Sequence, residues 1–209
     1  MCYDISTPGL TKLIKELPEY KSNYNGIQFY HVSAHTQPFL PVTTNDNHRT
    51  VEAAQWKLLP LTEEAKEENT YNIKSETIFK KDTYKHYITK YRGLLWADGF
   101  YEPYHVEDQQ KSENYYVYLP EKRIFSIGIV YAPWLNIETG ETINIFSILT
   151  TPANDLLTEM QGEKKRMPLI IPPDQRDAWL DTNEEEHIRK FFVPFNGLLS
   201  AHKVPVRQS

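Results

Sequence analysis

Hydrophobic residues along the chain follow two periods, one typical of amphipathic helices and one typical of strands. Leucine and isoleucine residues between positions 10 and 17 lie at helical spacing, and the run stops at Pro18. They predict a short amphipathic helix near the N-terminus. A capping-box spacing, Asn183 with Glu186, marks the start of another. That helix is predicted over residues 184–191, and others are predicted over residues 76–88, 154–160 and 174–180.

Runs of β-branched and aromatic residues, separated by turn residues, predict strands in the rest of the chain. These strands are expected over residues 27–32, 94–101, 115–119, 123–131 and 143–151. Pro120, Glu121 and Lys122 predict a hairpin connection between two of them. Because strands outnumber helices, the sequence predicts an α+β fold. Because no linker divides the chain, residues 1–209 are expected to form one domain.

Composition and charge point to a soluble protein. Hydrophobic residues make up 40% of the chain, which is enough for one substantial core. No N-terminal apolar run resembles a signal peptide or a membrane span, so a cytoplasmic monomer without membrane contact is expected. The net charge of −5 argues against binding duplex DNA through a bulk positive field, although a local basic groove stays possible. The acidic run at residues 63–68 is expected to be a solvated loop.

Several common chemistries lack their required residues. The sequence contains no Gly-rich phosphate loop, no dinucleotide-binding fingerprint and no His-Glu-x-x-His motif. His31 and His35 are four residues apart, but no carboxylate or cysteine lies near them at ligand spacing. We therefore expect neither a metal site nor a cofactor.

Cys2 is the only cysteine, and it directly follows Met1, so an internal disulfide is excluded. Initiator methionine is generally removed when the second residue is small, and removal would leave an amine and a thiol on one residue. Such a 1,2-aminothiol condenses with an aldehyde through the amine and then closes through sulfur to a thiazolidine. Reference pKa values of about 7.7–8.0 for the amine and about 8.5 for the thiol suit this chemistry. An idle cysteine at a frayed end is the alternative.

Two further segments carry candidate site residues. Residues 96–103 (Trp-Ala-Asp-Gly-Phe-Tyr-Glu-Pro) place Glu102 at a strand end between apolar groups, where desolvation can raise its pKa toward values useful for proton transfer. Equally, Glu102 can cap a turn or pair with a lysine. Residues 72–77 (Asn-Ile-Lys-Ser-Glu-Thr) combine an amide, a cation and a predicted helix start, which suits anion or carbonyl binding. Ordinary helix capping by Ser75 is the alternative.

Taken in order, these segments resemble the SOS-response-associated peptidase (SRAP) family over most of the chain. Each motif alone is weak, but their shared order with a cysteine directly after Met1 is specific. The matching segments are residues 1–2, 31–42, 55–60 (Gln-Trp-Lys-Leu-Leu-Pro), 72–77, 97–102 (Ala-Asp-Gly-Phe-Tyr-Glu), 150–154 (Thr-Thr-Pro-Ala-Asn) and 166–168 (Arg-Met-Pro). The resemblance implies one SRAP-like domain with a mainly antiparallel or mixed, barrel-like β-sheet and peripheral helices.

The resemblance also implies a function, which is to shield abasic sites in single-stranded DNA through a covalent thiazolidine link. Carried onto this sequence, it assigns Cys2 as the nucleophile, Glu102 as the proton shuttle and Asn72 as the group that holds the amine or sugar. The family is thought to remove its own leading residue, which implies an autopeptidase activity. The DNA-binding residues implied are Lys74 and Arg166 at phosphates and Trp56 at a base or the groove wall, with a core tryptophan as the alternative for Trp56.

Three departures from the family pattern concern charge. The family usually has a histidine two positions before the arginine of Arg-Met-Pro, and Lys164 occupies that position here. The family's usual Cys-Gly-Arg opening has Asp4 in place of its arginine. Lys74 replaces the arginine of the family segment that matches residues 72–77. A lysine is a poor base near neutrality unless it is desolvated, so slower adduct reversal or self-processing is expected. DNA affinity is expected to suffer more than aldehyde chemistry. Two other functions therefore stay open: a noncatalytic single-stranded nucleic-acid-binding module, and a thiol peptidase acting on other proteins.

Overall fold

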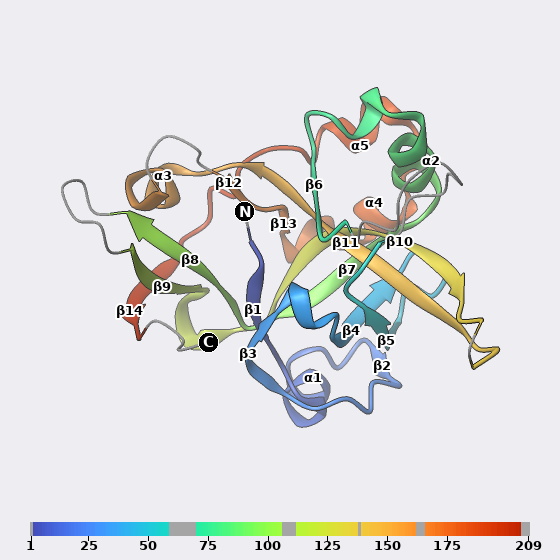
Figure 1. Cartoon of the computed structure of the whole chain (residues 1–209), viewed down its shortest axis with the longest axis horizontal. Coiled ribbons are helices and arrows are strands. Elements are labelled where there is room, and N and C mark those ends of the chain that lie inside the picture. Colours follow the sequence, from blue (N-terminus) through green and yellow to red (C-terminus); the bar gives the residue numbers. More distant parts are fainter. Residues whose placement is uncertain (1, 59–69, 106–111, 138, 162–165, 206–209) are drawn as a thin grey trace.

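A computed structural model describes residues 2–58, 70–105, 112–137, 139–161 and 166–205 of the chain. Among the described residues, more lie in strands than in helices, and the helices lie at the periphery of two sheets (Figure 1). The predicted α+β fold, with a barrel-like mixed sheet and peripheral helices, is therefore confirmed.

The first sheet has five strands, and every pairing in it is antiparallel. Its order is β14-β9-β8-β1-β3. The strands are β1 (Asp4–Thr7), β3 (Phe29–Ser33), β8 (Gly99–His105), β9 (Ser112–Tyr118) and β14 (Ser200–Val204). Strand β1 lies in its interior, so the residues that follow Cys2 are held from both sides.

The second sheet has nine strands, five of which close into a barrel. The ring runs β11-β10-β7-β4-β5, and a parallel contact between Gln55 and Ile145 joins β5 back to β11. The ring strands are β4 (Phe39–Thr44), β5 (Thr50–Gln55), β7 (Arg92–Ala97), β10 (Phe125–Leu135) and β11 (Thr142–Pro152). Short strands extend it: β2 (Lys21–Ser22), β6 (Asn72–Lys74), β12 (Arg166–Pro168) and β13 (Ile170–Ile171).

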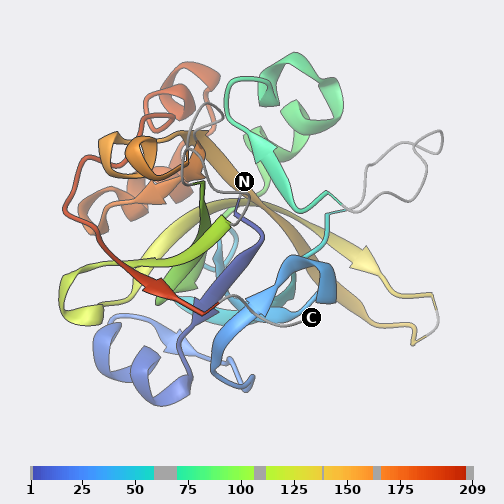
Figure 2. The ribbon, with the colours of Figure 1, turned by 60° about the vertical axis from the view of Figure 1, so that its left-hand side comes forward.

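Helices cover the outside of the barrel. The α-helices are α1 (Leu10–Glu16), α2 (Asp82–Lys90), α3 (Asp155–Gln161), α4 (Arg176–Asp181) and α5 (Glu185–Arg189). Short 3₁₀ turns are η1 (Ala34–Thr36), η2 (Ile78–Lys80), η3 (Pro120–Lys122) and η4 (Pro173–Gln175). Figures 1 and 2 both show α2, α4 and α5 gathered at one end of the molecule, with α1 at the opposite end.

Strand β7 explains how the chain builds two apolar cores. All of its residues are buried, and alternate side chains serve opposite faces. Leu95 and Ala97 belong to the core shared with Cys2 and Phe100, whereas Leu94 and Trp96 belong to the core under the helices. A strand buried on both faces needs a continuous apolar run, which residues 93–97 supply.

The predicted single strand over residues 94–101 is wrong, because the chain leaves one sheet and enters the other at Asp98. Strand β7 pairs with β4 and β10, while β8 pairs with β1 and β9. An added Cβ at Gly99 would lie 2.3 Å from the Tyr116 ring, so a larger residue at this crossing would displace that ring. The Asp98-Gly99 pair is a turn signal that the apolar run around it obscured.

Other local predictions were also corrected. Residues 76–88 do not form one helix: a strand and a 3₁₀ turn precede α2, so Ser75 caps no helix there. Residues 120–122 are not a hairpin turn, since β9 and β10 lie in different sheets. Asn183 does not cap α5, because its side-chain oxygen accepts a hydrogen bond from Arg92. Among the described residues, no helix is long and apolar enough to cross a membrane.

Candidate active site

Cys2 lies two residues before β1, and Glu102 lies in the neighbouring strand β8; both are buried, each with 1% of its surface exposed. The antiparallel register of β1 and β8 places Asp4 opposite Tyr101 and Ile5 opposite Phe100. The chain that leads from β1 back to Cys2 therefore runs beside Glu102. The Cys2 thiol donates to the Asp4 carbonyl oxygen at 3.8 Å. The structure thus brings the predicted nucleophile and the predicted proton shuttle together.

Burial shifts the protonation of both groups. It raises the pKa of Glu102 to about 7, an effect opposed by the positive charge of the amino terminus and reinforced by Asp4. Burial also raises the pKa of the Cys2 thiol, and the negative charge of Glu102 adds to this. Near neutral pH, Glu102 therefore exists in both protonation states, whereas the thiol is protonated. Such a carboxyl can both donate and accept a proton.

Asn72 brings an unpaired amide to the second sheet. It opens β6, opposite Ile148 of β11. Both polar atoms of its side chain, and Oε1 of Glu102, are buried without a hydrogen-bond partner among the residues that the structure describes. Buried polar groups are nearly always paired in folded proteins, and leaving one unpaired costs roughly 1–3 kcal/mol. Asn72 and Glu102 therefore each keep hydrogen-bonding capacity that the described residues do not use.

Ring contacts connect the two predicted site segments. Tyr3, next to Cys2, stacks on His35 with ring centroids 5.4 Å apart, and His35 meets the edge of Tyr71 at 5.3 Å. Tyr71 directly precedes Asn72. In Figures 1 and 2, β1 begins in the middle of the molecule, between β6 on one side and α3 with β12 on the other. The start of the chain and β6 therefore border one site.

Asp4 is held by a histidine on the adjacent strand. Its carboxylate lies 3.1 Å from Nε2 of His31, and the His31 ring stacks on Tyr101 at 3.9 Å. Asp4, which replaces the family's usual arginine, is thus paired with the imidazole of His31. Successive residues of a strand face opposite sides, and Ile5, which follows Asp4, is fully buried in the core. Asp4 and His31 therefore lie on the face of the sheet that points away from the core.

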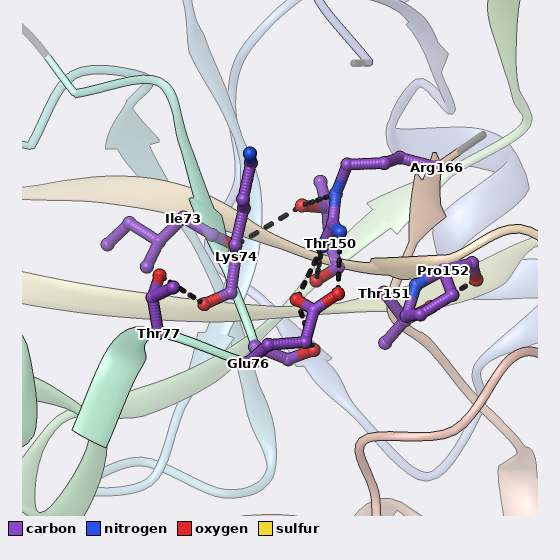
Figure 3. Close-up of polar contacts among 9 residues, drawn as sticks. Ile73, Lys74, Glu76, Thr77, Thr150, Thr151, Pro152 and Arg166 are labelled. Atoms are coloured by element: carbon purple, nitrogen blue, oxygen red, sulfur yellow. Dashed lines mark hydrogen bonds and ion pairs between the residues drawn. The ribbon is translucent and has the colours of Figure 1, made fainter. Parts of the chain in front are cut away.

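Arg166 does not present an uncompensated charge. Its Nη1 and Nη2 donate to the two carboxylate oxygens of Glu76 at 2.7 and 2.9 Å, and it also donates to Oγ1 and the carbonyl oxygen of Thr150 (Figure 3). This pairing lowers the pKa of Glu76. Lys74 is exposed, and Figure 3 shows its side chain extending away from that network. The two predicted phosphate ligands are neighbours, but Arg166 shares its charge with a carboxylate.

Trp56 lies in the core rather than in an interface. Its ring is fully buried, and Nε1 donates to the Tyr71 carbonyl oxygen at 3.0 Å. It cannot stack on a base in this conformation, and its burial agrees with the alternative of a core tryptophan. Lys164 lies outside the described residues. Within the described part of the chain, no three His, Cys, Asp or Glu side chains gather as a metal site would require.

Residues outside the candidate site also fix the position of the segment that contains Glu102. Asp98, which is buried, accepts a hydrogen bond from Lys12 at 2.6 Å and thereby ties α1 to the point where the chain changes sheet. Burial raises the pKa of Asp98, and Lys12 opposes that rise. Next to it, Tyr116 covers Gly99 and shares a 2.7 Å hydrogen bond with Ser6 of β1. These contacts fix β8, and therefore Glu102, against the strand that carries Cys2.

The sequence belongs to a known family, since the model of the SOS response associated peptidase (SRAP) family matches residues 6–207. The chain belongs to the SRAP family. Its relatives include the abasic site processing protein YoqW of Bacillus subtilis, 23% identical over 90% of this chain and 87% of that protein. HMCES of Rattus norvegicus, another abasic site processing protein, is 25% identical over 56% of this chain and 39% of its own.

Solved structures show the same fold. A protein from Bacteroides thetaiotaomicron superposes with a TM-score of 0.85 at 28% identity, covering 98% of this chain and 92% of that one. A Bordetella bronchiseptica protein, 20% identical, superposes with a TM-score of 0.79 over 98% of this chain and all of the other. The two-sheet architecture is therefore shared with these solved structures.

Proposed function

We propose that the protein captures abasic sites in single-stranded DNA as a thiazolidine on Cys2, once Met1 has been removed. The observation that carries this proposal is the burial of Cys2 beside Glu102, a carboxyl whose pKa burial raises to about 7. Family membership and the names of the relatives support the substrate. Depurinated deoxyribose equilibrates with an open-chain aldehyde, which is the electrophile that an aminothiol traps.

The reaction uses both functional groups of Cys2. The α-amine adds to the aldehyde carbon and gives a carbinolamine, and Glu102 in its protonated form assists departure of the hydroxyl as water. The thiol sulfur then adds to the resulting iminium carbon, while the Glu102 carboxylate accepts the thiol proton. One C–N and one C–S bond form, and one water leaves. A carboxyl with a pKa near 7 can perform both proton transfers in sequence.

Asn72 and the cations around β6 supply binding. The unpaired amide of Asn72 can hydrogen-bond the sugar hydroxyl or the attacking amine, which restricts the approach of the aldehyde. Lys74 provides an exposed charge for a phosphate, and Arg166 shares its guanidinium between Glu76 and the DNA backbone. The same nucleophile and carboxyl also support removal of Met1, with Lys164 in the position of the family's histidine.

The proposal is tested by incubating Met1-free protein with a single-stranded oligonucleotide that bears one abasic site. A heat-stable adduct should run above the free protein on a denaturing gel, and Cys2→Ser should abolish it because oxygen does not form a stable ring there. An oligonucleotide without the lesion is the control. Failure of the intact protein to form any adduct rejects the proposal. Salt-sensitive binding that survives Cys2→Ala, without any adduct, would instead establish a noncatalytic binding module.

A further inference from the structure

Three rings from separate segments meet beside the proposed reaction centre. Tyr3 precedes β1, His35 lies in η1, and Tyr71 precedes β6. The Tyr3 and His35 rings are nearly parallel, 21° apart, while Tyr71 meets His35 edge-on at 75°. His35 is exposed and the two tyrosines are half-buried. We call Tyr3, His35 and Tyr71 the aromatic ledge.

The turn that carries His35 is fixed to the N-terminal segment. The backbone N–H of Ala34 donates to the Tyr3 carbonyl oxygen at 2.7 Å. Gln37 adopts a left-handed φ of 48° and donates its N–H to Ala34, and the Thr36 hydroxyl donates to the Ser33 carbonyl oxygen at 2.7 Å. The segments that carry Tyr3 and His35 are therefore held in position before any ligand binds. This lowers the entropic cost of binding a ligand there.

Tyr71 is fixed by the buried wall behind it. Its carbonyl oxygen accepts hydrogen bonds from Trp56 Nε1 and from the Ile148 N–H, each at 3.0 Å. Since Trp56 is fully buried, it cannot contact a base itself, but it anchors a residue that borders the site. The aromatic surface open to a ligand at this position is thus the ledge.

We propose that the aromatic ledge binds the nucleobase adjacent to the abasic sugar by stacking. This inference rests on the proposed function. Tyr3 follows Cys2 and Tyr71 precedes Asn72, so the ledge borders both residues that would handle the sugar. A base next to an abasic sugar has lost a stacking neighbour, and an aromatic ring can take that place for any base. The exposed His35 ring, supported on its other side by Tyr3, is the contact surface.

The test compares two single strands that cannot react, each with a central tetrahydrofuran analogue of the abasic sugar. In one strand adenines flank the analogue, and in the other its neighbours are also baseless spacers. Fluorescence anisotropy should show that the wild-type protein binds the adenine strand about tenfold more tightly. His35→Ala should reduce this ratio to near one. His35→Phe should restore it, because phenylalanine keeps a ring but cannot titrate.

His86 is the matched control, since it is also exposed and also contacts two tyrosine rings, Tyr87 and Tyr91, but lies on α2. His86→Ala should leave the ratio unchanged. The proposal is wrong if wild type and His35→Ala give the same ratio of affinities for the two strands, or if His35→Phe does not restore the wild-type ratio. Because these strands form no adduct, the result is separate from the crosslinking assay on a true abasic site. Loss of crosslinking with an intact ratio would reject the proposed chemistry and keep the ledge.

Discussion

At the scale of single residues, the site depends on one carboxyl that folding removes from water. In the unfolded chain Glu102 has the ordinary pKa of a glutamate. In the folded protein, burial raises this pKa to about 7. The carboxyl is thereby available in both protonation states at neutral pH. Its unpaired Oε1 is the cost of that position, which is typical of a functional group rather than a structural one.

Replacing this carboxyl by an amide tests its role. Glu102→Gln should slow adduct formation about 100-fold, since general acid–base catalysis contributes roughly 10²–10⁴-fold. Adduct formation should be followed across pH 5–9, and the wild-type profile should contain a transition near pH 7 that the variant lacks. The remote pair of Glu185 with Arg189 provides a control: Glu185→Gln should keep the wild-type rate and profile. A wild-type profile for Glu102→Gln would remove the carboxyl from the mechanism.

The same substitution has a consequence for stability whose sign follows from the pKa. Because the folded-state pKa lies above the unfolded value of about 4.5, the folded protein binds the extra proton between about pH 4.5 and 7. This contribution to stability is complete below pH 4.5 and is lost as pH rises through 7. Denaturant unfolding of Glu102→Gln should lack that decline. A steeper decline in the variant would contradict the assigned burial effect.

Residue-scale prediction from sequence rested on motifs, and the roles it assigns stay predictions. Cys2, Asn72 and Glu102 were predicted from their motifs, and the structure brings their segments to one place. Trp56 was predicted to contact a base or support the groove wall, with a core tryptophan as the alternative, and its complete burial agrees with that alternative. His35 was considered for metal binding alone, because the ring contact with Tyr3 depends on tertiary structure that no local pattern encodes.

At the scale of elements, a buried arginine holds the helices to the barrel. Arg92 begins β7, and its guanidinium donates to carbonyl oxygens at the ends of α2 and α4 and to the Asn183 side chain. Burial lowers its pKa to about 10. These carbonyl groups come last in their helices and have no partner within the helix. One side chain therefore completes the ends of two helices.

Removing this side chain should destabilise the protein strongly. Arg92→Leu leaves several buried acceptors unpaired, and each unpaired group costs roughly 1–3 kcal/mol, so a loss of at least about 3 kcal/mol is expected. Urea unfolding measures it. Arg123, whose pair with Glu121 is exposed, is the control, and Arg123→Leu should unfold at nearly the wild-type urea concentration. Equal midpoints for the two variants would show that Arg92 does not hold the helices.

Element prediction from sequence worked for isolated patterns and failed where tertiary pairing decides. The helix after Pro8 and the strands at β10 and β11 agree with their hydrophobic periods. Residues 72–74 directly precede a segment that was predicted to be helical, but they form a strand. They pair with β11, whose edge is open to them. Similarly, the run through Asp98 looks continuous in sequence, but β7 and β8 pair with different strands, which depends on tertiary structure.

At the scale of the whole molecule, the site forms where the two sheets meet. The five-stranded sheet supplies Glu102 and the segment behind Cys2, while the nine-stranded sheet supplies Asn72, Lys74 and Arg166 through β6 and β12. Neither sheet holds the proposed reactants alone. The pattern of predicted strands and helices indicated an α+β fold, but the closure of β5 onto β11 joins residues far apart in the chain and follows from no local signal.

The intact mass of the protein before and after reaction tests the central claim most directly. Purified protein should lack Met1, and after incubation with a single-stranded abasic oligonucleotide its mass should equal protein plus oligonucleotide minus one water. Fragmentation should place the link on Cys2, and the species should survive heating. A link on another residue, or no mass gain from Met1-free protein with its thiol intact, would contradict the account.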